Sequence, residues 1–235
     1  QSMLSNVGQE VEGQVGERLQ LAIDELQRNT REIQESVMSM RMLPVNMTFN
    51  RFPRVVRDLS SKLGKKVDLV IQGGNTEIDK SLIEKLVDPL THLVRNSIDH
   101  GIESPEKRLE AGKAENGTVI LSAEQKGSSI IIGIIDDGAG LNKARIVEKA
   151  TQNGLTVTPD MTDSEIWQLI FQAGFSTAAE VTDVSGRGVG MDVVRRNIES
   201  IGGRIEIESS QGEGSAFYIH LPLTLAIVDG MCVSV

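Results

Sequence analysis

The sequence predicts an α+β fold: an α/β sandwich in which a mixed sheet carries helices on one face, preceded by a long helix. Two observations predict this class. Apolar residues recur at alternating steps of four and three through residues 17–40, as in a long bundle or coiled-coil helix. Residues 118–221 then hold strand-like segments mixed with helical ones, without the strict β-α-β alternation of a parallel sheet.

The long helix carries a narrow apolar seam. Its positions are Leu19, Ile23, Leu26, Thr30, Ile33, Val37 and Met40, with the threonine as the polar exception. A helix cannot cover such a seam by itself, so a partner helix is needed. Because the chain supplies one full-length helix here, we expect a homodimer. Packing of the seam on the domain that follows is the alternative.

The rest of the chain is expected to mix helices and strands. Helices are predicted at 55–63, 104–112, 142–152, 163–173 and 191–201, and strands at 67–71, 118–124, 129–136, 204–209 and 215–221. The Ile-rich strand 129–136 is expected to be central and covered on both faces. Asp79 is a good N-cap for a further helix that ends at Gly101, and Pro89 either kinks that helix or restarts it with Asp88 as the cap.

That further helix presents a polar stripe. At about 100° per residue, Asn96 and Asp99 both fall within about 40° of His92, with His100 beside them. The opposite face is apolar, so the stripe is expected to border a cleft. An amide, a carboxylate and two imidazoles can hold a divalent cation and its phosphates. A solvated helix face without a site is the alternative.

Composition excludes several classes of function. A net charge of −9 disfavours a nucleic-acid surface, and no apolar run is long enough to span a membrane. Cys232 is the single cysteine, which rules out an internal disulfide and suits a reducing cytoplasm. The basic residues Arg51, Arg54 and Arg57 are spaced like the outer edge of a helix. The chain reads as an excerpt from a longer protein.

Two glycine-rich runs follow regular elements, where main-chain amides can face an anion. The run ending at Met191 opens a helix, so its N–H groups could hold a triphosphate. Asp136, at the end of the Ile-rich strand, can accept a hydrogen bond from an exocyclic amine of adenine. The GxxxxGK[ST] phosphate loop is absent, and Met191 occupies the third glycine position of a dinucleotide-binding GxGxxG motif. Taken alone, each run could be a simple turn.

Five segments then occur in a recognisable order: HLVRNSIDHG, DDGAG, FQAGFST, GRGVGMDVV and GEGSAF. Together they resemble the N, G1, F, G2 and G3 boxes of the histidine-kinase ATP-binding domain of the GHKL superfamily. Longer stretches such as DPLTHLVRNSIDHGIE resemble the CheA-type chemotaxis histidine kinases. The resemblance implies an ATP- and Mg²⁺-dependent kinase with a dimerisation region (1–45), a catalytic domain (46–222) and the start of a CheW-like regulatory domain (223–235).

The resemblance also implies roles for single residues. Asn96 is the expected Mg²⁺ ligand and, with His92, the catalytic pair. His92 occupies the place of the general-base glutamate of gyrase- and Hsp90-like ATPases, which favours phosphoryl transfer over hydrolysis. Residues 154–187 resemble a lid that includes Phe171. The expected nucleotide-binding residues are Asn96, Asp99, His100, Asp136, Gly138, Gly140, Phe175, Ser176, Thr177, Gly186, Arg187, Gly188, Val189, Gly190 and Met191.

The phosphoryl acceptor is expected elsewhere. The histidines are His92, His100 and His220, and none lies on the long helix. CheA-type kinases carry the acceptor on a separate phosphotransfer domain. The resemblance further implies a cytoplasmic dimer that works with a CheW-type adaptor, chemoreceptors and CheY- or CheB-type response regulators, without nucleic acid or direct membrane insertion. A gyrase- or Hsp90-like conformational ATPase and a non-catalytic dimeric scaffold are the alternatives.

Overall fold

The computed structural model describes residues 14–39, 41–172, 175 and 190–223. The chain divides into two compact units, Gln1–Met42 and Leu43–Val235. Residues 224–235, which include most of the predicted start of a regulatory domain, lie outside the described residues.

The first unit contains the predicted long helix, α2 (Gln14–Ser39). Two of its seam residues, Leu26 and Ile33, are 57% and 64% exposed in the single chain, whereas Ile23 is buried. The Thr30 hydroxyl is satisfied locally because it donates to the main-chain oxygen of Leu26 at 2.7 Å. The helix is thus confirmed, and part of its apolar seam is uncovered. Met40 lies outside the described residues.

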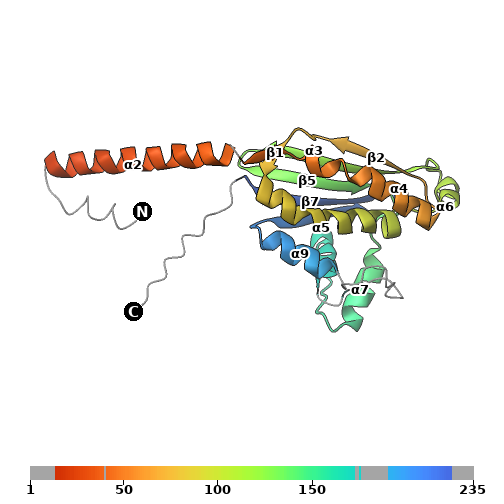
Figure 1. Cartoon of the computed structure of the whole chain (residues 1–235). Helices are drawn as coiled ribbons and strands as arrows, with labels where there is room; N and C mark the ends of the chain where they lie inside the picture. The colour runs from red at the N-terminus through yellow and green to blue at the C-terminus, as the bar shows by residue number, and fades with distance from the viewer. Residues whose placement is uncertain (1–13, 40, 173–174, 176–189, 224–235) are drawn as a thin grey trace. The chain divides into compact units, whose positions relative to one another are not determined.

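The second unit is built on a five-stranded mixed sheet with the order β2-β4-β5-β7-β6 (Figure 1). Its strands are β2 (Val67–Gln72), β4 (Gly117–Lys126), β5 (Ser129–Asp136), β6 (Arg204–Ser210) and β7 (Gly214–Pro222). β2 runs parallel to β4, and the other neighbouring pairs are antiparallel. A separate two-stranded sheet joins β1 (Met42–Pro44) to β3 (Glu77–Asp79).

β5 is the central strand, as its isoleucine content predicts. Ile130, Ile132 and Ile134 are fully buried on one face, whereas Ile131 and Ile135 on the other face are only partly buried. The expectation that both faces are covered is therefore wrong. The physical reason is that the packed helices lie on one face, so the alternate side chains meet no second layer.

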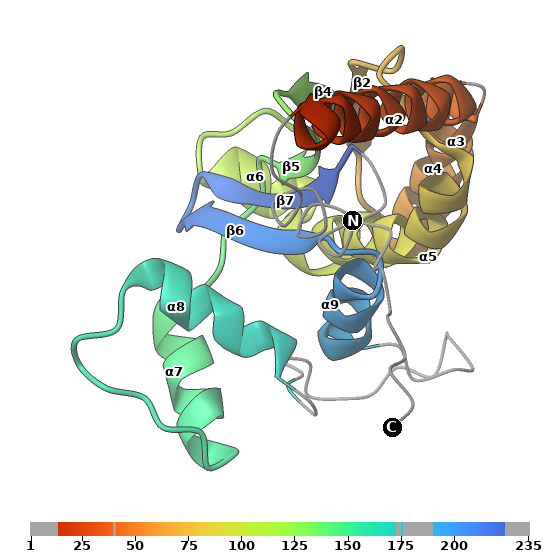
Figure 2. The ribbon, with the colours of Figure 1, turned by 90° about the vertical axis from the view of Figure 1, so that its left-hand side faces the viewer.

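The second unit contains the helices α3 (Asn46–Phe49), α4 (Phe52–Leu63), α5 (Lys80–Asn96), α6 (Pro105–Glu110), α7 (Lys143–Gln152), α8 (Asp163–Gln168) and α9 (Met191–Glu199), with a 3-10 turn η2 (Leu169–Phe171) after α8. Most of these helices lie on the side of the buried face of the sheet, whereas α6 lies at one end of the strands (Figures 1 and 2). α5 packs against β5 and α9, and α8 packs on β6 beside α7. The predicted mixed sheet with helices on one face is confirmed. No helix in these described ranges is long and apolar enough to cross a membrane.

The helix that carries the polar stripe is α5. It begins at its predicted N-cap, where the Asp79 side chain accepts a hydrogen bond from the Ser81 N–H at 2.7 Å. It then continues through Pro89, so the predicted restart at Asp88 is wrong. Proline has no main-chain N–H, so the helix lacks one N–H···O=C hydrogen bond at this position. Pro89 itself is buried, and packing in the core stabilises the helix despite this loss. After Asn96 the chain forms a π-helical turn, η1 (Ser97–Gly101).

Candidate nucleotide-binding site

The polar stripe is divided between two kinds of helix. His92 and Asn96 belong to α5, whereas Asp99 and His100 belong to the π-helical turn. The turn closes through a hydrogen bond from Ile102 N to Ser97 O at 2.7 Å, five residues apart, so the α-helical spacing does not extend to its end. Asp99 and His100 nevertheless stay together, with 3.9 Å between Oδ2 and Nε2. π-helical turns often occur at functional sites.

Asp136 ends the central strand and is 4% exposed. Burial raises the pKa of its carboxyl group, while the hydrogen bond from the Gly138 N–H acts in the opposite direction. The bond from Gly138 N to Oδ1 is 3.1 Å long. A carboxylate has about four acceptor positions, so this bond leaves acceptor capacity for an outside donor such as an amine.

The loop after Asp136 lies directly against the end of the π-helical turn. Ala139 N donates to Gly101 O at 2.9 Å, and a Cβ atom on Gly138 would lie 2.2 Å from that same oxygen. A Cβ on Gly101 would lie 3.0 Å from the Asp136 carboxylate. Gly140 has a φ of 72°. A side chain on Gly138 or Gly101 would therefore crowd the contact between the helix end and the loop.

The second glycine-rich run contacts the end of α5 through its last residues. Gly190 is the N-cap of α9, and the Asn96 Nδ2 atom donates to the Sδ atom of Met191 at 3.1 Å. This contact joins the start of α9 to the end of α5, and it uses the amide nitrogen of Asn96 rather than the amide oxygen. Ser176, Thr177, Gly186, Arg187, Gly188 and Val189 lie outside the described residues. Phe171 and Phe175 are buried in the hydrophobic core.

His92 lies one helical turn before Asn96. Burial lowers its pKa, and the positive charges of Arg95 and His100 lower it further. An imidazole below its usual pKa of 6.5 is neutral at pH 7, so one ring nitrogen is available as a hydrogen-bond acceptor.

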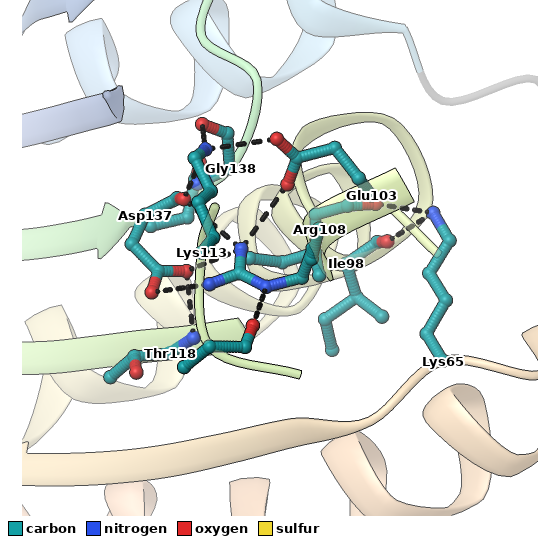
Figure 3. A network of polar contacts seen from close by, with 11 residues as sticks. Lys65, Ile98, Glu103, Arg108, Lys113, Thr118, Asp137 and Gly138 are labelled. Carbon is teal, nitrogen blue, oxygen red and sulfur yellow. Dashed lines mark hydrogen bonds and ion pairs between the residues drawn. The ribbon is translucent and has the colours of Figure 1, made fainter. Parts of the chain in front are cut away.

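A buried ionic network holds the loop after Asp136, and sequence reasoning missed it (Figure 3). The Arg108 side chain, with the residue only 1% exposed, donates to both carboxylate oxygens of Asp137 at 2.9 and 3.1 Å. Lys113 donates to the main-chain oxygens of Asp137 and Gly138 at 2.9 and 2.7 Å. Both cations also bind Glu103. Residues 104–112 read as a surface helix, and no periodicity in the sequence signals that its arginine is buried.

The carboxylate of Glu103 completes this network. Burial alone would raise the pKa of Glu103, but the hydrogen bond from Lys113 and the charges of Lys113 and Arg108 hold it below its usual value. Two cations thus face two carboxylates and a set of main-chain oxygens. The main-chain oxygens of Asp137 and Gly138 are therefore held by Arg108 and Lys113.

Fold and site together define a nucleotide-binding domain, and comparison with known proteins identifies its family. Residues 85–225 match the model of the histidine kinase-, DNA gyrase B- and HSP90-like ATPases. The chain belongs to this family. The catalytic domain of the histidine kinase ThkA has the same fold, with a TM-score of 0.50 and 16% identity over 78% of this chain and 96% of that domain.

Within the family, the chain is similar to the chemotaxis protein CheA. It is 60% identical to CheA of Salmonella typhimurium over 100% of its own length and 35% of that protein. It is also 49% identical to the sensor histidine kinase CheAY of Helicobacter pylori, over 93% of this chain and 28% of that protein. The predicted membership of the CheA-type, GHKL group is confirmed, and the chain spans about a third of the length of these relatives.

Proposed function

We propose that this chain is the dimerisation and catalytic part of a chemotaxis histidine kinase. The observation that carries the proposal is the meeting of three segments at one place: the end of α5 with its π-helical turn, the loop after Asp136, and the first residues of α9. A buried carboxylate with acceptor capacity left over, next to the end of the π-helical turn, suits an adenine nucleotide.

Different residues bind different parts of the nucleotide. Asp136 accepts a hydrogen bond from the exocyclic amine of adenine, and the glycines allow the main chain to approach the ring closely. The first N–H groups of α9 face the phosphates. Asn96 supplies an amide oxygen to Mg²⁺, which neutralises charge on the phosphates and usually takes only one or two protein ligands. In the part of the chain that the structure describes, no cluster of three or more His, Cys, Asp or Glu side chains could hold a metal ion.

The γ-phosphoryl group passes to a histidine nitrogen of a separate phosphotransfer domain, and ADP is the leaving group. Catalysis then depends on positioning and on charge neutralisation rather than on a protein nucleophile. His92 lacks the carboxylate that would activate water, which favours this transfer over the conformational ATPase alternative. Relay to response regulators, coupling through an adaptor and receptors, and a cytoplasmic location follow from the same proposal.

The uncovered seam of α2 supports a homodimer. Leu26 and Ile33 expose large apolar surfaces seven residues apart on one helix. Burying each side chain against a second copy would contribute about 1.5–3 kcal/mol, so a parallel or antiparallel pair of α2 helices is favourable.

The proposal is tested by incubating the chain with γ-labelled ATP and Mg²⁺, with and without a phosphotransfer domain. We expect acid-labile phosphate on that domain and slow release of free phosphate without it. Rapid ATP hydrolysis in the absence of the domain would favour the conformational ATPase. If the chain failed to bind ATP at all, the scaffold alternative would be supported instead.

A further inference from the structure

The main chain of the π-helical turn that follows α5 is capped by one lysine (Figure 3). The Lys65 Nζ atom donates hydrogen bonds to the main-chain oxygens of Ile98, Asp99 and Ile102 at 2.8, 2.6 and 2.7 Å. The last carbonyl groups of a helix lack partners within the helix, and a cation beside them also compensates the negative end of the helix dipole. An ammonium group has three N–H donors, and these bonds use all three.

Lys65 is also held firmly at its own main chain. It follows Gly64, the residue with a φ of 65° that ends α4, and its N–H donates to Ser60 O at 2.9 Å. Its side chain is half-buried, so burial lowers its pKa, while the charges of Asp99 and Glu103 act in the opposite direction. Three acceptors require the protonated amine, because a neutral amine has only two N–H groups. Lys65 thus ties the junction of α4 and β2 to the π-helical turn.

The opposite side of this turn faces the proposed nucleotide. Gly101 lies against the Asp136 carboxylate, and its oxygen accepts the bond from Ala139. The π-helical turn is therefore held between Lys65 on one side and the loop after Asp136 on the other. Since the two contacts share five residues of main chain, loss of the lysine bonds would let Gly101 shift relative to Asp136.

We propose that Lys65 is a positioning residue that sets nucleotide affinity from outside the site, which rests on the function proposed above. The ammonium group keeps the main chain of the turn where Gly101 and Asp136 form one wall of the adenine pocket. Lys65 itself is assigned no contact with the nucleotide. Its effect should therefore appear in binding rather than in the chemical step.

The test compares Lys65→Met with Lys66→Met in the full chain. Lys66 is the neighbouring lysine; it is exposed and pairs with Glu115 at 2.6 Å, so its loss controls for charge and for the substitution itself. For Lys65→Met we expect the dissociation constant of Mg-ADP, measured by calorimetry, to rise by about 2- to 30-fold, the range of energetic coupling through packed networks. In phosphotransfer to the separate phosphotransfer domain, the KM for ATP should rise in parallel, and kcat should stay within about twofold of the parent value. Lys66→Met should change neither.

The outcomes separate this inference from the proposed function. If the parent chain does not bind Mg-ADP, the proposed function fails and this inference falls with it. If the parent binds and Lys65→Met binds equally well, Lys65 is only structural and this inference alone is overturned. Should Lys65→Met not fold, Lys65→Gln, which keeps two N–H donors, replaces it under the same criteria. A shift of the Gly101 and Ala139 amide resonances in the ligand-free Lys65 variant, but not in Lys66→Met, would support the positioning role.

Discussion

Two adjacent aspartates are expected to respond in opposite ways to the same substitution. Asp136→Asn removes the carboxylate that accepts a hydrogen bond from the adenine amine. It places an amide N–H₂ group, which is a donor, in the same position. A hydrogen bond to a charged group contributes about 1.5–3 kcal/mol. The affinity for Mg-ADP should therefore fall by about 10- to 150-fold.

The stability of the Asp136→Asn variant should not fall. Because folding raises the pKa of Asp136, the folded protein binds this proton more tightly than the unfolded chain. Ionisation of this group therefore costs stability as the pH rises through its unfolded and folded pKa values. Asparagine cannot ionise, so at neutral pH the free energy of unfolding should stay the same or increase.

Asp137→Asn is the matched comparison. Asp137 accepts two hydrogen bonds from the buried Arg108, so its loss should lower the free energy of unfolding by about 1–3 kcal/mol, or Tm by about 3–9 °C. Calorimetric titration and thermal unfolding of both variants measure the two effects. Wild-type affinity in Asp136→Asn would contradict the adenine assignment. An equal loss of stability in both variants would show that Asp136 is structural.

Three further predictions concern the other parts of the account. Asn96→Asp should lower the phosphotransfer kcat by at least about 100-fold with thermal stability unchanged, and near-normal labelling of the phosphotransfer domain would contradict its role. The pKa of His92 lies below 6.5, so phosphotransfer activity should decline on acidification only at a pH below the titration range of an ordinary histidine. His92→Gln should abolish this decline. An unchanged pH–rate profile in this variant would contradict the role assigned to His92. Leu26→Glu combined with Ile33→Glu should dissociate the dimer in sedimentation experiments, whereas Leu21→Glu, equally exposed but outside the seam, should not.

Local patterns were sufficient for the main strands and for most of the helices. Alternation and glycine turns placed the edges of β4 and β5 within a few residues, and Asp79 was correctly assigned as an N-cap. These features depend on neighbouring residues only. The short β1–β3 pair and α3 were not expected, because three- or four-residue elements leave no periodicity to detect.

Contacts between distant segments were harder to predict. The resemblance brought Asn96, Asp136 and Met191 to one place, but it did not indicate that Arg108 is buried or that Lys65 caps the helix end. Both depend on main-chain oxygens, which have no signature in the sequence. The π-helical turn also escaped prediction, since a uniform 100° rotation per residue assumes an unbroken α-helix.

The central claim is that the end of α5, the loop after Asp136 and the start of α9 bind one adenine nucleotide. Amide chemical-shift mapping with a non-hydrolysable ATP analogue and Mg²⁺ tests it most directly. We predict that the largest shifts in the described part of the chain cluster at residues 96–102, 136–140 and 190–191. Shifts confined to other surfaces, such as those of α4 and β2, would contradict the account.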